Sequence, residues 1–225
     1  SISPASPTWR PASAPAGILP WPAKLNGVQV LVNNPPAHLY SERTDQNNFE
    51  IPSNAPQSGT ADVQVIETAT GRVLGDTTVV MNTVSPGVFT QTASGSGDGV
   101  IANSDGTLNT SANPVAAGSI VTIYMTGQGY ISGMPPDGNV LGTALSTPYT
   151  PCVYVGGTGC VPPANVTYSG LAPTLVGIWQ INVLIPKDVI SVPTVPVQVF
   201  VQVNSLVSGG GGLGRPVYIY VKAPS

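Results

Sequence analysis

Short runs in which apolar and polar residues alternate are the feature that most constrains the fold of this chain. An alternation with a period of two places the apolar side chains on one face of a β-strand. No stretch repeats apolar residues at helical spacing, and Asn-Gly or Asp-Gly pairs, which favour hairpin turns, recur along the chain. The pattern predicts an all-β fold of the sandwich type. The runs are VQVLV (28–32), DVQVIE (62–67), SIVTIYMT (119–126), WQINVLI (179–185), VPVQVFVQV (195–203) and PVYIYVK (216–222).

Charge is scarce in this sequence. Charged residues make up 8% of the 225 residues, against about 25% in an average soluble domain. Seven lysines and arginines, spread over the whole length, cannot form the basic surface that contacts with phosphate require. A hydrophobic content of 41% argues against a disordered chain, and no apolar run approaches the roughly 18 residues of a membrane helix. We therefore expect a folded protein with no nucleic-acid partner and no membrane span.

An internal repeat divides the chain. QNNFEIP at 46–52 and QINVLIP at 180–186 share a Gln, an Asn two positions later and a final Ile-Pro. The same offset of 134 residues aligns VQV at 63–65 with VQV at 197–199. The repeat predicts two related β units in tandem. We expect a proline-rich extended tail at 1–22, a first β-sandwich unit at 23–90, a connecting hairpin segment at 91–113 and a second unit at 114–225.

We expect the first of the two units to lack an opening strand. The strand predicted at 118–126 has no counterpart, because the position 134 residues earlier falls before Ser1. The proline-rich tail that precedes the unit donates few ladder hydrogen bonds. A sandwich without this strand exposes an edge that can pair with another chain. We therefore expect the tail to leave its own unit and lie along a neighbouring subunit, with an assembly interface formed by Ile2, Trp9, Ile18, Leu19 and Trp21.

A series of short motifs resembles a known family. PGVF, NSDG, AGSIVTIYMTGQG, PPDG, YSGLAP and VGIWQINVLIP occur here in the order of the Solibacter-type uncharacterised C-terminal domain, a secreted repeat found at the ends of large exported bacterial proteins. The resemblance covers most of residues 20–222. It implies a pair of immunoglobulin-like β-sandwiches and export from the cell, and it implies no known activity.

Cys152 and Cys160 flank VYVGGTG, whose glycine-rich turn would bring the two strands beside it together. In an exported protein, an even number of cysteines favours a disulfide, and two packed thiols are the alternative. Closing so short a loop would stabilise the fold by about 2–3 kcal/mol. Two cysteines without a nearby histidine argue against a zinc site.

Residues for catalysis or metal binding are few. His38 has no acidic residue within three positions, and the chain contains no GxSxG elbow, so we expect a structural or surface histidine. Asp98, Asn103 and Asp105 could offer oxygen ligands to calcium, but their spacing fits no EF-hand loop and hairpin turns explain them. We expect no catalytic residue, no cofactor and no metal. Asn109 and Asn165 begin N-glycosylation sequons whose modification stays open.

The positions of the three tryptophans bear on whether the protein assembles with itself or binds sugars. Trp179 belongs to a strong strand and is expected in the core, whereas Trp9 and Trp21 lie in the tail. Tail aromatics can anchor an interface, pack within their own chain, or stack on sugars. We predict an extracellular or cell-surface structural subunit of a filament or surface assembly, with copies of itself as partners. The alternative is a secreted carbohydrate-binding or adhesive module with a surface polysaccharide as partner.

The absence of a leader sequence is interpreted as cleavage before Ser1.

Overall fold

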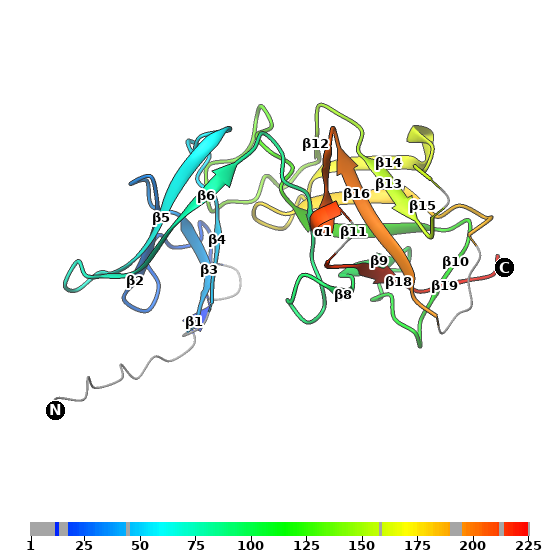
Figure 1. Ribbon diagram of the computed structural model, residues 1–225, viewed down its shortest axis with the longest axis horizontal. Coiled ribbons are helices and arrows are strands. Elements are labelled where there is room, and N and C mark those ends of the chain that lie inside the picture. Colours follow the sequence, from blue (N-terminus) through cyan, green and yellow to red (C-terminus); the bar gives the residue numbers. More distant parts are fainter. Residues whose placement is uncertain are drawn as a thin grey trace. The chain divides into compact units, whose positions relative to one another are not determined.

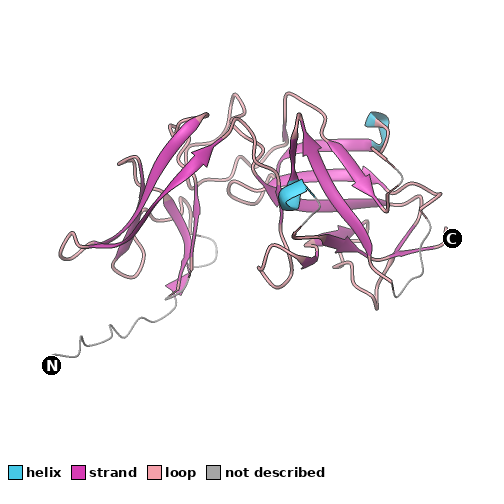
Figure 2. Ribbon diagram, in the orientation of Figure 1, coloured by secondary structure: helices cyan, strands magenta, loops and turns pink. Residues whose placement is uncertain are grey.

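A computed structural model describes residues 12–13, 18–43, 46–157, 159–189, 195–211 and 214–224. Nearly all of its regular structure is β-strand (Figure 2), which confirms the predicted all-β fold. The described residues form two short helices, η1 (Pro163–Asn165) and α1 (Ser208–Gly211), and neither is long or apolar enough to cross a membrane. The chain forms two compact units. The first comprises Ser1–Asn82 and Pro135–Val140, and the second comprises Thr83–Met134 and Leu141–Ser225.

The described part of the first unit contains two antiparallel sheets. One sheet has the order β1 (Ala12–Ser13), β3 (His38–Glu42), β4 (Asn47–Glu50), and the other has the order β2 (Val28–Val32), β5 (Gly59–Glu67), β6 (Val73–Met81) (Figure 1). The alternation in VQVLV buries every second residue of β2, as its period predicts. The core consists of Val30, Val32, Ala37, Leu39 and Ala61, with partly buried side chains such as Phe49 packed against it.

Two larger sheets form the described part of the second unit. The first has the order β12 (Leu145–Ser146), β14 (Val166–Leu171), β15 (Trp179–Leu184), β11 (Ile120–Thr126), β7 (Gly87–Val88), and β9 (Ile101–Asn103) also pairs with β11. The second has the order β13 (Cys152–Val155), β16 (Val197–Val203), β18 (Val217–Ile219), β8 (Gly97–Asp98), with β17 (Leu206–Val207) on β16. A parallel pair, β10 (Val115–Ala116) and β19 (Val221–Lys222), lies outside these sheets.

The division between the units differs from the sequence-based expectation. Residues 91–113, expected to connect the units, supply β8 and β9 to the second unit, because β8 pairs with β18 and β9 with β11. Residues 135–140 lie within the second half of the chain but belong to the first unit. A turn motif such as PPDG says nothing about which unit it packs on, so neither assignment was visible in the sequence.

The tail also differs from expectation. Ala12 pairs with Glu42 and Ser13 with Ser41, so β1 lies beside β3 of its own chain. The prediction that the whole tail leaves its own unit is therefore wrong for these residues, because the outer edge of β3 offers them a place in the sheet. Ile2 and Trp9, two of the predicted interface residues, lie outside the described residues.

Candidate functional site

The repeat makes β4 of the first unit equivalent to β15 of the second. An offset of 134 places Asn47 on Ile181 and Phe49 on Val183, and it places β5 on β16 through the shared VQV. In the second unit, β15 lies between β14 and β11. In the first unit β4 pairs with β3, and no strand among the described residues pairs with its other side (Figure 1). We call this side the open edge of β4.

Backbone groups at the open edge follow from the register of the β3–β4 hairpin. The N–H of Arg43 donates to the carbonyl of Gln46 at 2.9 Å, and neighbouring residues of an antiparallel strand point their backbone groups in opposite directions. Asn48 therefore faces β3, whereas Asn47 and Phe49 face the open edge. The equivalent direction is occupied in the second unit, where the N–H of Ile185 donates to the carbonyl of Ser119 at 2.9 Å, just before β11.

Side chains near the open edge are less buried than their counterparts. Val183 and Ile185 are buried in the second unit, whereas Phe49 is partly buried and Ile51 is 45% exposed. On the facing sheet, Val63 is partly buried although its counterpart Val197 lies in the core. The inward residues of β11, which close this region in the second unit, are Val121, Ile123 and Met125, all fully buried.

Asn47 adds a polar feature to the same region. Its Oδ1 atom is buried and has no hydrogen-bond partner in the described part of the chain. The equivalent residue in the second unit is Ile181, which is fully buried and needs no partner. A buried acceptor without a donor costs about 1–3 kcal/mol, so Asn47 would gain from a donor supplied beside β4.

Exposed apolar side chains gather at the start of the described first unit. Ile18 is 54% exposed and Leu19 is 44% exposed, and their assignment to an assembly interface stays a prediction. Trp21 stacks at a tilt on Tyr40, with ring centroids 5.1 Å apart, and Tyr40 remains 49% exposed. The carbonyl of Pro22 accepts from the N–H of Leu39 at 2.8 Å, which holds this segment along β3. Three predicted interface residues, Ile18, Leu19 and Trp21, thus form a half-exposed apolar strip on their own unit.

The segment Pro135–Val140 binds the first unit through its turn. The N–H of Gly138 donates to Glu50 Oε2 at 2.5 Å, and its carbonyl accepts from the N–H of Trp21 at 2.8 Å. The N–H of Ser53 donates to the Asp137 carboxylate, at 3.0 Å and 3.2 Å from its two oxygens. Burial raises the pKa of Glu50 and the nearby Asp137 charge adds to this, while the Gly138 N–H opposes it.

His38 lies beneath this turn. It lies opposite Glu50 in the pairing of β3 with β4. This carboxylate is 12 positions away along the chain, so the sequence near His38 does not reveal it. Its Nδ1 atom is buried without a hydrogen-bond partner among the described residues, and Glu50 accepts from Gly138. A Cβ atom on Gly138 would lie 2.1 Å from His38 Nδ1. The close contact makes the histidine a packing partner of the turn, in line with its predicted structural role.

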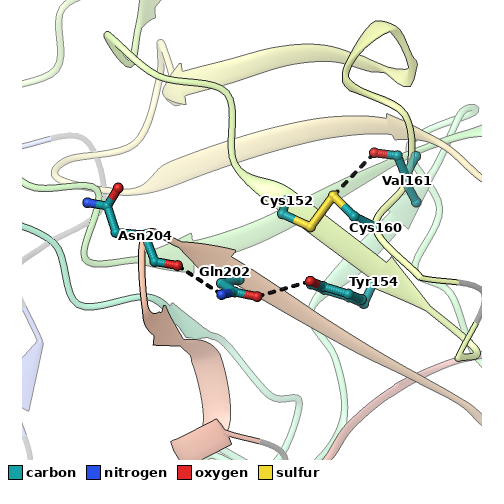
Figure 3. The surroundings of a disulfide bond; sticks show 6 residues. All are labelled: Cys152, Tyr154, Cys160, Val161, Gln202 and Asn204. Carbon is teal, nitrogen blue, oxygen red and sulfur yellow. Dashed lines mark hydrogen bonds between the residues drawn. A yellow bond between two sulfur atoms is a disulfide. The ribbon is translucent and has the colours of Figure 1, made fainter.

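The predicted disulfide joins Cys152 and Cys160, whose Cα atoms are 5.4 Å apart (Figure 3). Residue Val161 beside it donates its N–H to the carbonyl of Val153 at 2.8 Å, which ties the loop back to β13. On the same strand, the Tyr154 hydroxyl donates to Gln202 Oε1 at 3.0 Å. The disulfide prediction is confirmed.

The three residues that could offer oxygen ligands to calcium, Asp98, Asn103 and Asp105, form hydrogen bonds within the protein. Asp98 accepts from the Tyr220 hydroxyl at 3.1 Å, and Asp105 accepts from the N–H of Thr107 at 2.9 Å. The side chain of Asn103 donates to the carbonyl of Asn113 at 3.1 Å. Within the described ranges, no group of three or more histidine, cysteine or acidic side chains could hold a metal ion.

Other sequence-based candidates fall into the second unit. Asn109, the asparagine of the first sequon, is buried, and its Nδ2 donates to the carbonyl of Tyr220 at 2.9 Å. The side-chain amide of this sequon is therefore engaged in a hydrogen bond within the fold. Asn165 is partly buried in η1. Trp179 is fully buried, and its Nε1 donates to Ser169 Oγ at 3.0 Å, which confirms its predicted place in the core.

Comparison of the chain with family models, with curated proteins and with solved structures finds no match. The resemblance to the Solibacter-type domain stays a prediction.

Proposed function

We propose that this protein is an extracellular structural subunit that assembles with copies of itself into a filament or surface array. The observation that carries the proposal is the open edge of β4, since the equivalent strand β15 has a partner on both sides. An edge strand with unpaired backbone groups is a template for pairing with another chain. The first unit is then completed by a neighbouring subunit, in the way that β11 completes the second.

The composition supports close packing of many copies. A formal net charge of −3 on 225 residues leaves little repulsion between subunits. A contact between the tail of one copy and a different surface of the next is heterologous, so it does not close on itself and yields an open chain of subunits. The disulfide supports an oxidising compartment such as the cell exterior. On this proposal the two units are tandem immunoglobulin-like sandwiches, as the Solibacter-type resemblance implies, and the first lacks its opening strand.

The test is imaging and mass determination of the native protein. Negative-stain microscopy should show filaments or arrays, and light scattering should give masses far above 22.9 kDa. Deleting residues 1–11 keeps β1 in place and should yield a folded monomer, because the remaining chain retains every described strand. A full-length protein that stays monomeric at all concentrations contradicts the proposal, whereas a deletion variant that still assembles shows that residues 1–11 do not make the contact.

A carbohydrate-binding role is the second candidate, and the Trp21–Tyr40 pair favours it. Half-exposed aromatic rings can stack on sugar rings, and Tyr40 keeps 49% of its surface exposed. Affinity electrophoresis in gels that contain bacterial surface polysaccharide would show retardation of the protein. Tyr40→Ala should abolish this retardation and leave assembly unchanged. Equal mobility with and without polysaccharide would contradict this role.

A further inference from the structure

We propose that the open edge of β4 accepts residues 1–11 of a second copy as an added strand, in the place that β11 holds in the second unit. This inference rests on the proposed self-association and names the surface and the segment that perform it. The backbone direction of β4, the side chains beside it and the sequence of the tail all support this contact.

The backbone of β4 presents the right groups for an added strand. Asn47 and Phe49 point their N–H and C=O groups to the open edge, as the register of the β3–β4 hairpin requires. The equivalent residues of β15, Ile181 and Val183, pair with Ile123 and Val121 of β11. Main-chain hydrogen bonds of this kind give affinity in strand addition, and alternate side chains give specificity.

Side chains of the added strand would cover the apolar surface that is now partly exposed. In the second unit the residues of β11 that pair with Ile181 and Val183 are also those that point into the core. By the same geometry, the tail residues that bond to β4 would point at Phe49 and Val63. A hydroxyl or amide on that face can also donate to the buried Asn47 Oδ1, which lacks a partner among the described residues.

The sequence of residues 1–11 suits such a strand. Ala5, Pro7 and Trp9 alternate with Ser6, Thr8 and Arg10 after the first few residues, so an extended chain has an apolar face and a polar face. With the apolar face inward, the N–H groups of Ala5 and Trp9 point to β4, and Pro7 removes one ladder bond. Proline is tolerated in an edge strand, and the added strand lies at an edge.

A second copy is the occupant because the tail of the same chain starts from the far side of the sheet. Ala12 and Ser13 pair with β3 on the side opposite to β4, in the order β1-β3-β4. For Trp9 of the same chain to pair with the open edge, it would have to lie three strand spacings, roughly 14 Å, from Ala12, whereas the three residue steps between them span at most about 11 Å. The tail of a neighbouring copy meets no such requirement.

Mixing two full-length variants, each with one added cysteine, tests the inference. One carries Asn48→Cys, at an exposed position of β4, and the other carries Ser6→Cys, Thr8→Cys or Arg10→Cys on the outward face of the tail. The native cysteines are joined in a disulfide, so the new thiols react alone. After mild oxidation we expect a covalent heterodimer on non-reducing gels with at least one tail variant. Val80→Cys, on the exposed side of β6, replaces Asn48→Cys as the matched control and should give none.

Each outcome of this experiment decides between the two proposals. If the protein assembles but no tail variant cross-links to Asn48→Cys of another chain, β4 does not accept the tail of a second copy and the proposed self-association stands. A further variant that carries Asn48→Cys and the tail cysteine in one chain separates the two cases: a cross-link within this chain, with no heterodimer in the mixture, means that the added strand is intramolecular and overturns the inference. An equally strong cross-link to Val80→Cys overturns it as well. If the full-length protein does not assemble at all, the proposed function itself fails.

As an independent check, Asn47→Pro removes an outward N–H of β4 and leaves the bonds to β3. We expect this variant to keep its circular dichroism spectrum and to lose the heterodimer. Retention of the heterodimer at the wild-type yield would show that the β4 ladder is not used.

Discussion

The two units of this chain share a strand sequence but bury it to different extents. In the second unit, 23 apolar residues of the described chain form one buried cluster, whereas five form that of the first. The shared VQV is part of the core in β16, but in β5 its valines are partly exposed. The difference lies in β11, whose inward side chains cover β15 and have no described counterpart over β4. The same strand sequence can therefore pack into a core in both units, but its side chains are fully buried only where a neighbouring strand such as β11 covers them.

The largest expected difference between the units comes from truncating one core side chain in each. Trp179→Ala should lower the free energy of unfolding of the second unit by about 3–5 kcal/mol, because the ring is fully buried. Phe49→Ala should cost the first unit less, about 1–2 kcal/mol, because the ring is only partly buried. Denaturant unfolding followed by circular dichroism measures both. An equal or larger loss for Phe49→Ala would mean that the first core is already closed.

Much of this architecture could be predicted from period-two patterns. The runs at 28–32, 62–67, 119–126 and 179–185 all coincide with strands, because alternation dictates a half-buried strand regardless of context. The disulfide could be predicted because a glycine-rich turn separates its two cysteines. The equivalence of β4 and β15 could be predicted as well, because the offset of 134 residues is a property of the sequence itself.

Contacts between distant segments could not be predicted. Glu50 meets Gly138 across 88 positions, and nothing in PPDG distinguishes a docked turn from an exposed one. The pairing of Ala12 with Glu42 was missed because prolines in the tail argue against a strand, whereas two residues between prolines suffice for a short ladder at an edge. The open edge of β4 could be recognised as a candidate site only after the strand orders of both units were known, because the repeat alone does not show which strand lacks a neighbour.

Removing the disulfide should lower the stability of the second unit alone. Replacing Cys152 and Cys160 by serine removes the closure of a loop with a sequence separation of 8, which stabilises the fold by about 2–3 kcal/mol. Calorimetry should show the transition of the second unit at a lower temperature and that of the first unit unchanged. A shift of both transitions would mean that the two units unfold as one.

Gly138 tests how strongly the turn at 135–140 holds the first unit. It has a φ of +80°, and a Cβ atom would approach His38 Nδ1 and lie 3.0 Å from the N atom of Trp21. Gly138→Ala should therefore destabilise the first unit by roughly 2–3 kcal/mol. Gly71→Ala is the matched control, since Gly71 has a φ of +73° and nothing within 4 Å, and it should cost about 1 kcal/mol. Equal melting temperatures for the two variants would show that the turn adapts without loss.

The smallest expected effect is a pH dependence of the first unit that arises from Glu50. Burial raises the pKa of this carboxyl above its value in the unfolded chain, which is near 4.5. Protonation therefore favours the folded state: the contribution of Glu50 to stability is complete below pH 4.5 and is lost as the pH rises through the raised pKa. Glu50→Gln, which keeps an acceptor for the Gly138 N–H, removes this dependence. Relative to this variant, the wild-type first unit should lose stability as the pH rises from 4 to 7.

Asp137→Asn gives the matched control for this titration. It removes the negative charge that adds to the raised pKa of Glu50 and keeps an oxygen that can accept from the N–H of Ser53. The pH dependence of the first unit should therefore become weaker in this variant but should not vanish, because burial is the larger cause. Melting temperatures of the three proteins between pH 4 and 7 provide the comparison. A wild-type first unit that gains stability over this range relative to Glu50→Gln would mean that the Gly138 N–H outweighs the burial of the carboxylate.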